Sequence, residues 1–458
     1  MKFLRKFNEH SSYEAELSGG VDISLPNVSY CKDVKDVHYN PYNTVEFYVG
    51  DITGTTPQTV KIYTDRSTSI PIQVSDGNKW YSYLLPKDNG LYKIESGIYD
   101  YEERTWSNGI VKKAVVKADI SYSYDEDNYT YNGIVPNEIT EASFKGSDTT
   151  NVTSMRDMFS YCSGLTSLDV SNFNTSSVID MREMFSYCSC LTSLDVSNFN
   201  TSNVTDMGSM FEGCGGLTSL DVSNFNTSNV TDMGRIFFYC SGLTSLDVSS
   251  FDTSKVTNME RMFCYCINLT SLVLIDLDMS KVTNMYAMFG HCSGLTHLDV
   301  SNFDTSNVTN MNNMFQGCNG LTELNVSSFN TSNVTDMSLM FSGCNGLTFL
   351  DLSNFDTSKV TDMNSMFNGC GGLTELDVSN FKTSNVTSMV RMFNNCSGLT
   401  FLDLSGWDTS NVTNMDYMFS SCTSLNIIRM KGCSGATRTK IQNQLTADGI
   451  TGVTIVTE

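Results

Sequence analysis

The stretch NVTSMRDMFSYCSGLTSLDVSNFNTSS, residues 151–177, indicates the fold of most of the protein, because nearly the same sequence recurs through most of the chain that follows. A cysteine lies three residues after its phenylalanine, and this spacing is kept in every later copy. A fixed period of this length is typical of a solenoid, in which each repeat packs only on its neighbours. The phenylalanine returns every 26 residues, eleven times in all, at Phe159, Phe185, Phe211, Phe237, Phe263, Phe289, Phe315, Phe341, Phe367, Phe393 and Phe419.

One repeat, residues 204–229, predicts a helix followed by a short strand. Its apolar residues from Val204 to Leu217 follow one another at steps of 3, 3, 1, 3 and 3, which places them on one face of a helix. The Thr-Ser-Asn triplet before this segment supplies capping side chains, and the Gly-Gly pair near its end stops it. Residues 217–222 then alternate as a strand. We therefore expect an α/β repeat, with one strand and one helix in each coil and strands stacked about 4.8 Å apart.

The region before the array has a different composition, since all six prolines of the chain lie before residue 137. Runs such as TVEFYVGD, TVKIYTD and KWYSYLLP combine β-branched and aromatic residues between turn signals. They predict a small β-rich domain within about residues 43–124. Residues 139–144 align with the strand of later repeats and predict the first strand of the array.

The far end of the array also departs from the repeat. Residues 425–430 continue the strand column, and TRTKIQNQLTADG and TGVTIVTE then predict a basic helix and a last strand. Terminal repeats of a solenoid are expected to be atypical, because they shield the open core. The predicted parts are therefore a leader (1–42), a β-rich domain with its connector (43–138), eleven repeats (139–424) and a C-terminal cap (425–458).

Charge and motifs exclude several classes of function. The net charge of −22 argues against nucleic acid and anionic membranes as partners. The first twenty residues hold three basic residues, Lys2, Arg5 and Lys6, but no apolar core of a secretory signal, and no run of 18 apolar residues predicts a membrane span. No hydrolase, zinc-protease, phosphate-loop or dinucleotide motif is present. We therefore predict no catalytic residue and no cofactor.

The chain has fifteen cysteines, of which eleven belong to the repeat. One cysteine at a fixed inward register in each repeat is expected to be a small buried core residue. Oxidation between stacked neighbours is the alternative. Cysteines 188 and 190, and likewise 264 and 266, resemble metal pairs only weakly, since no second pair with histidine at ligand spacing supports them. We predict no metal site.

A column of aspartates occupies the outward position between two inward residues of the predicted strands. Stacked carboxylates repel one another, so the column needs partners. Three interpretations are open: a structural ladder hydrogen-bonded to hydroxyls and backbone, a Ca²⁺ site, or a ligand-binding face. The column comprises Asp169, Asp195, Asp221, Asp247, Asp299, Asp351, Asp377 and Asp403.

A second outward column changes along the chain while the scaffold positions stay uniform. It is serine in the first five repeats and then becomes His297, Glu323, Phe349, Glu375 and Phe401. A recognition surface would vary in this way, and so would a surface under relaxed constraint. The predicted ligand-binding candidates are these five residues together with Asp299, Asp351, Asp377 and Asp403.

The repeat LTSLDVSNFNTSNVTDMxxMFxxC is similar to leucine-rich repeats, and more closely resembles the BspA-like repeats of bacterial surface proteins, over about residues 139–433. That resemblance implies a leucine-rich-repeat-like solenoid and a tendency to bind other molecules. The leader, with LPNVSYCKDVKDVHYNP at 25–41, resembles N-terminal segments of virion-associated proteins of gut tailed bacteriophages. The resemblance implies attachment to a particle through Asn27, Tyr30, Cys31, His38, Tyr39 and Pro41.

Three functions follow as hypotheses. The first is a non-enzymatic phage virion protein, assembled in the host cytoplasm, which is held by its N-terminus and presents the solenoid to a host cell, glycan or mucosal surface. The second is a bacterial cell-surface adhesin. The third is an enzyme within residues 43–138. The expected partners are other virion proteins and a host surface protein or glycan, and association between copies of the chain is left open.

Overall fold

The computed structural model describes Thr149, Thr150 and residues 152–458, and upstream of them the backbone of short strands. The attachment candidates Asn27, Tyr30, Cys31 and Pro41 lie outside the described residues. The chain forms two compact units, which are described separately. One consists of Met1–Val204 with Gly213–Asn224, and the other of Thr205–Glu212 with Phe225–Glu458.

The first unit contains a six-stranded sheet in the order β11-β10-β9-β2-β3-β6. Strand β10 (Glu141–Ser143) pairs in parallel with β11 (Ser167–Asp169), with Glu141 opposite Ser167, 26 residues later. This confirms the predicted first strand. The earlier strands are β1 (Ile23–Ser24), β2 (Val34–Tyr39), β3 (Thr44–Val49), β4 (Gln58–Tyr63), β5 (Ser69–Val74), β6 (Lys79–Leu84), β7 (Tyr99–Asp100), β8 (Thr105–Trp106) and β9 (Lys113–Val116).

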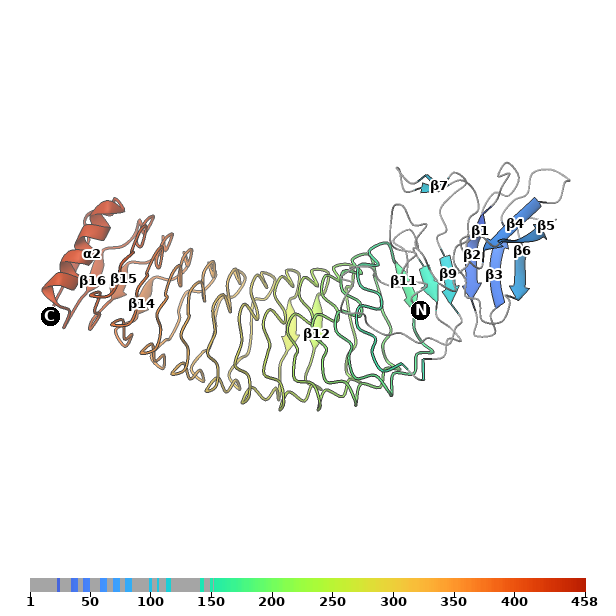
Figure 1. Ribbon diagram of the computed structural model, residues 1–458. Coiled ribbons are helices and arrows are strands. Elements are labelled where there is room, and N and C mark those ends of the chain that lie inside the picture. Colours follow the sequence, from blue (N-terminus) through green and yellow to red (C-terminus); the bar gives the residue numbers. More distant parts are fainter. Residues whose placement is uncertain are drawn as a thin grey trace. The chain divides into compact units, whose positions relative to one another are not determined.

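The second unit is a stack of 26-residue coils joined by short parallel strands (Figure 1). From β12 to β16 the paired residues lie one repeat apart, as in Leu246 opposite Leu272 and Leu376 opposite Leu402, whereas β17 pairs with β16 at a separation of 27 residues. The predicted solenoid and its period are confirmed. The described strands are β12 (Ser245–Asp247), β13 (Ser271–Val273), β14 (Glu375–Asp377), β15 (Phe401–Asp403), β16 (Ile427–Arg429) and β17 (Thr454–Val456).

The prediction of a helix in every coil is wrong for the described residues. Among them the structure has one α-helix, α2 (Gly435–Ala447), which lies after the last repeat. The segment around each core phenylalanine is instead a series of tight turns. Two residues of each segment, placed two before and two after the phenylalanine, have positive φ. In one coil these are Arg261 with φ 52° and Tyr265 with φ 62°.

Hydrogen bonding between coils explains why the turns replace a helix. Alternate backbone N–H groups donate to the next coil, as from Arg261 to the carbonyl of Tyr286 (2.7 Å) and from Phe263 to that of Met288 (2.9 Å). The N–H groups between them donate three residues back within the coil, as from Met262 to Met259. Groups used between coils are lost to the i→i−4 bonds of a helix. The 3, 3, 1, 3, 3 spacing therefore marks inward positions of turns.

The core is built from identical residues stacked one coil apart. Phe263 is fully buried, and its ring centroid lies 5.8 Å from that of Phe237 and 5.7 Å from that of Phe289. Burial of one such side chain stabilises the fold by about 1.5–3 kcal/mol. Because the same pair of contacts recurs at each step, the core continues from coil to coil through the unit.

The repeat cysteines are buried, as predicted, and they also act as hydrogen-bond donors. The thiol of Cys292 donates to the carbonyl of Phe263 in the previous coil, with an Sγ–O distance of 3.0 Å. Burial raises the pKa of Cys292 well above its ordinary value, so the thiol keeps its proton. Among the described cysteines outside the repeat register, Cys190 is exposed and Cys264 and Cys433 are buried.

Helix α2 closes the C-terminal end of the stack, as the sequence predicts. Its residues Ile441 and Leu445 are fully buried. Asp448, which ends the helix, accepts a hydrogen bond at Oδ2 from the backbone N–H of Phe419 (2.8 Å), a group that in earlier coils donates to the next coil. Lys440 donates from Nζ to the carbonyls of Thr409 and Val412. The cap thus satisfies backbone groups of the last coil as well as covering its apolar surface.

Candidate ligand-binding surfaces

The first candidate surface is the strand row, defined as His297, Glu323, Phe349, Glu375 and Phe401. Its residues occupy the same register in successive coils, and Glu375 pairs directly with Phe401 between β14 and β15. The side chains of His297 and Glu323 meet, with Nδ1 and Oε1 3.3 Å apart. Phe349 is 71% exposed, a large value for an aromatic residue. The structure therefore brings the five predicted residues together as one outward row.

Phe401 and Asp403 share a partner that the sequence analysis missed. The guanidinium of Arg429, on β16, lies 5.3 Å from the ring centroid of Phe401. The same guanidinium is 3.3 Å from the buried carboxylate of Asp403, between Nη1 and Oδ2. Arg429 lies one repeat after Asp403 in the strand register, so this alignment was the available signal.

The aspartate column is held by backbone donors. Asp299 and Asp351 each accept a hydrogen bond at Oδ1 from the N–H of the serine two residues later, at 3.0 Å. Asp377 and Asp403 do the same at 2.9 Å. Hydrogen bonds from the side chain and backbone of Ser301 lower the pKa of Asp299, so its carboxylate is charged at neutral pH. These contacts favour the hydrogen-bonded ladder among the three interpretations. Within the described residues no group of three His, Cys, Asp or Glu side chains is arranged to hold a metal ion.

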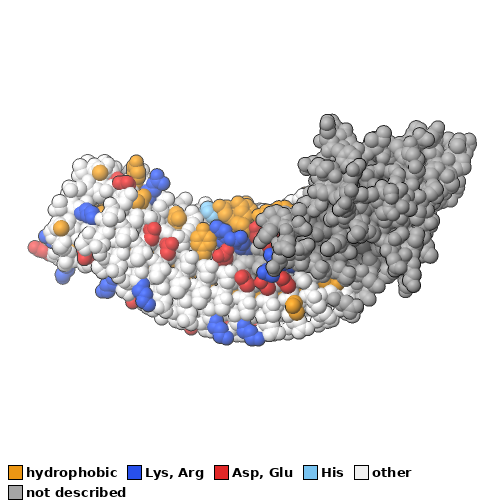
Figure 2. Space-filling view, in the orientation of Figure 1, with side chains coloured by type: hydrophobic (Ala, Val, Ile, Leu, Met, Phe, Trp, Pro, Cys, Tyr) orange, Lys and Arg blue, Asp and Glu red, His pale blue; other side chains and the backbone are white. Residues whose placement is uncertain are grey.

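The second candidate surface lies on the turns and was not predicted. It is the aromatic–arginine cluster, defined as Arg235, Phe238, Tyr239, Arg261, Tyr265, Tyr286 and His291. Its central feature is a stack of three rings, in which Tyr265 lies 4.4 Å from Tyr239 and 4.4 Å from His291 between ring centroids. Figure 2 shows hydrophobic side chains gathered beside basic and histidine side chains midway along the described repeats.

Arg261 is fixed between two aromatic rings at the side of this stack. Its guanidinium carbon lies 4.8 Å from the ring centroid of Tyr286 and 5.7 Å from that of Phe238. Its Nη2 also donates a hydrogen bond to the hydroxyl of Tyr286, at 3.2 Å. Arg235, one coil earlier, forms an ion pair with Glu260 at 2.9 Å. The two arginines therefore differ: Arg235 has a carboxylate partner, and Arg261 has none among the described residues.

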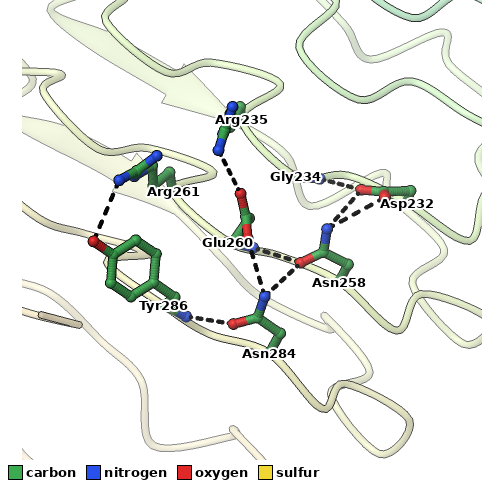
Figure 3. Close-up of polar contacts among 8 residues, drawn as sticks. All are labelled: Asp232, Gly234, Arg235, Asn258, Glu260, Arg261, Asn284 and Tyr286. Carbon is green, nitrogen blue, oxygen red and sulfur yellow. Dashed lines mark hydrogen bonds and ion pairs between the residues drawn. The ribbon is translucent and has the colours of Figure 1, made fainter. Parts of the chain in front are cut away.

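A ladder of hydrogen-bonded polar side chains runs beside Arg235, Arg261 and Tyr286 of the cluster (Figure 3). Asn258 donates from Nδ2 to Asp232 (3.1 Å), and Asn284 donates from Nδ2 to Asn258 (3.1 Å) and to Glu260 (3.2 Å). The amide oxygen of Asn284 accepts the backbone N–H of Tyr286 at 3.0 Å. The ladder ties three successive coils together and fixes the backbone from which the cluster residues project.

The aromatic stack ends where a glycine, Gly317, follows His291 in the register. Gly317 has φ +70°, and a Cβ added there would lie 2.5 Å from Nδ1 of His291. A side chain at this position would therefore meet the ring where it now lies, because the absence of a Cβ on Gly317 lets the histidine side chain lie over the backbone of the next coil. In the first unit Tyr161 and Tyr187 stack in the same manner, at 4.6 Å, and Gly213 has its would-be Cβ 2.6 Å from Tyr187.

The sequence held a signal for this cluster. The position two residues after each core phenylalanine is occupied by Tyr, His, Gly, Asn or Ser, so it varies as the strand row does. This pattern was not recognised because the prediction of a helix placed each of these residues on the surface of a separate helix. In the turns, the residues instead align in a row across the coils.

Comparison with known proteins gives one family. The model described as "Mycoplasma protein of unknown function, DUF285" matches residues 132–245, 191–293, 268–349 and 344–431. No curated protein matches the chain. A solved structure titled "Crystal structure of TLR13-ssRNA13 complex" aligns at 15% identity with a TM-score of 0.21, over 65% of this chain and 50% of that chain. The alignment thus spans half of the length of that protein.

Proposed function

The chain belongs to the DUF285 family, and we propose that it is a non-enzymatic adhesion protein whose strand row binds a macromolecule on a cell or mucosal surface. The description of the family gives no function. The proposal therefore rests on the surface of this chain.

The observation that carries the proposal is the exposed strand row on a uniform scaffold. Phe349 is 71% exposed, although the same register holds serine in earlier coils such as those of Ser245 and Ser271. Exposed aromatic residues are enriched where proteins bind other molecules, and they supply much of the binding energy there. The row also alternates acidic with aromatic residues from Glu323 to Phe401, a pattern that suits an extended ligand, protein or glycan.

We also propose that the N-terminal region anchors the chain on a phage particle, as the leader resemblance implies. His38 and Tyr39 belong to β2, which pairs with β3 and β9. A truncation that tests attachment should therefore end before β2, since loss of that strand would disturb the sheet. The alternative is anchoring on a bacterial cell surface, which the BspA-like resemblance implies.

The strand row is tested by a variant in which its five residues are all replaced by serine. Serine is the native residue at this register in earlier coils, so the variant should fold. Lys382→Asn is the matched control, because it changes another exposed position to the residue of earlier coils. Arrays of purified glycans and of cell-surface proteins would be probed with the three full-length proteins.

We expect at least one ligand to bind the natural chain and the control, and to bind the serine variant with an affinity about tenfold or more lower. Because the proposed protein is not an enzyme, the bound ligand should be chemically unchanged when it is recovered. Equal binding by the serine variant, or no ligand on either array, would contradict the proposal.

Attachment is tested by deleting residues 1–33, which removes Asn27, Tyr30 and Cys31 together with the two-residue strand β1, the partner of β4, and leaves β2 in place. The expected result is loss of the chain from gradient-purified particles, with its solubility and the unfolding midpoint of the repeat array unchanged. Normal incorporation of the truncated chain would show that another part docks.

A further inference from the structure

The aromatic–arginine cluster is a second binding surface, and we infer that it recognises a carboxylate of an acidic protein segment, with an apolar side chain beside that carboxylate. The cluster lies on the turns and shares no residue with the strand row, so this inference goes beyond the proposed adhesion role.

Arg261 supplies the charge for such recognition. Its guanidinium is oriented by Tyr286 and Phe238, and Nη2 donates to the hydroxyl of Tyr286. Within the described residues it has no carboxylate partner, although the whole chain carries a net charge of −22. A planar guanidinium held in this way can offer its remaining N–H groups to a carboxylate with little further loss of freedom.

The stacked rings favour an anion as well. Both faces of the Tyr265 ring are covered, by Tyr239 and by His291, each at 4.4 Å. A ligand can therefore approach this ring at its edge and not at its faces. The edge of an aromatic ring carries partial positive charge, so edges attract carboxylate oxygens where faces would repel them.

The same geometry favours a protein over a glycan. Sugars stack on aromatic faces, and the faces of Tyr265 are occupied. The surrounding surface is apolar, since Tyr239 is 43% exposed and Ile267, four residues after the core phenylalanine of its coil, is 42% exposed. An apolar side chain next to the carboxylate would cover this area, and aromatic residues with arginine are the side chains enriched at protein interfaces.

Substitutions at Arg261 and Tyr239 separate recognition from folding. Arg261→Gln removes the charge and keeps the side-chain stem. Its matched control is Arg391→Gln, at the same register in another coil, where the guanidinium lies 5.5 Å from the ring of Tyr417 and φ is 55°. Tyr239→Gly removes an exposed ring and installs the residue that the register holds at Gly343.

A random peptide library displayed on phage would be selected on the full-length chain. Enriched peptides would be synthesised with their acidic residues and with the corresponding amides. Binding to the natural chain and to the three variants would be measured by fluorescence anisotropy, together with binding of acidic oligosaccharides.

We expect enriched peptides to contain Asp or Glu beside an apolar residue. Their affinity should fall about tenfold or more with Arg261→Gln, or with the amide peptide, and little further when both changes are combined. Arg391→Gln should bind as the natural chain does, and Tyr239→Gly should bind more weakly.

Peptides without carboxylates, unchanged affinity for Arg261→Gln, or no enrichment at all would overturn the inference. Arg261-dependent binding of the acidic oligosaccharides without peptide binding would overturn it as well, and would assign the cluster to glycans.

Discussion

Phe263 lies between Phe237 and Phe289 in the core stack, and none of its surface reaches solvent. Replacing it with alanine would leave a cavity that rigid neighbours on both sides cannot fill. We expect Phe263→Ala to lower the free energy of unfolding by about 3–5 kcal/mol, measured by urea denaturation.

Lys281→Ala is the control for this substitution, because Lys281 is exposed on the same coil stack. Its effect should be within about 0.5 kcal/mol of zero. If the two variants unfold at the same urea concentration, Phe263 does not lie in a packed core.

The buried thiols predict a pH dependence of stability. Burial raises the pKa of Cys318 and of Cys370 to about 12, from the ordinary thiol value of 9.0. A pKa that is raised by folding gives stability that is fully present below the ordinary thiol pKa and is lost as pH rises towards 12. We expect the free energy of unfolding under reducing conditions to fall between pH 9 and about 11.

Replacing Cys318 by alanine isolates the thiol contribution from that of other groups that titrate at high pH. The variant should lose less stability between pH 9 and about 11 than the natural chain does. An equal loss in both proteins would show that the thiol does not carry the effect.

Among the elements, the sequence predicted the strand register and the ends of the array but not the turns. A strand was predicted in every coil, and within the described repeats it forms in some coils, such as those of β12, β13, β14 and β15, and not in others. Strand positions followed from the period and from the Leu-x-Val or Leu-x-Leu spacing, as in Leu246 and Val248, because inward residues of a strand alternate. The turn segment has a spacing that a helix satisfies equally well. Its left-handed corners were hidden because they hold residues such as Glu183, Arg235 and Leu339, for which positive φ is uncommon.

The same limit applied to the candidate surfaces. The strand row was visible in the sequence, because its residues share one register of the repeat. Glu375 and Phe401 lie on β14 and β15, whereas the structure has no strand at His297, Glu323 and Phe349. The aromatic–arginine cluster was missed, since contacts such as that of Arg261 with Tyr286 join side chains of different coils through the turns. Only the inter-coil hydrogen bonds define which side chains meet there.

Helix α2 carries a prediction about the end of the stack. Deleting residues 434–458 would expose the surface now covered by Ile441 and Leu445 and would leave the N–H of Phe419 without Asp448. We expect the truncated chain to form aggregates, seen by size-exclusion chromatography with light scattering. Asp448→Asn, which keeps the helix and an amide oxygen as acceptor, should remain in the state of the natural chain. A truncated chain that also remains in that state would show that the last coil needs no cap.

At the scale of the whole molecule, stability and recognition come from the same repetition. Each coil contacts its neighbours, so the array is stable by summation over local interfaces. Positions that face inward are therefore held constant, while outward positions are free to vary from coil to coil. Both candidate surfaces depend on this difference between constant inward and variable outward positions. The cluster depends also on the turn segments, which place residues of successive coils side by side.

The sign of one substitution distinguishes coils built from stacked turns from coils that contain a helix. Gly369 has φ +76°, and a Cβ added there would meet only ordinary contacts, the nearest being 3.6 Å away at the Cα of Gly343. In a left-handed turn, Gly369→Ala should lower the free energy of unfolding by about 1–2 kcal/mol. In a helix the same change should raise it by about 1 kcal/mol.

Gly371→Ala, two residues later and without positive φ, is the matched control. The measurement is urea unfolding of the natural chain and both variants. Our account predicts that Gly369→Ala is less stable than the natural chain and than Gly371→Ala. A gain of stability on Gly369→Ala would contradict this expectation and would indicate that the segment around Gly369 is a helix.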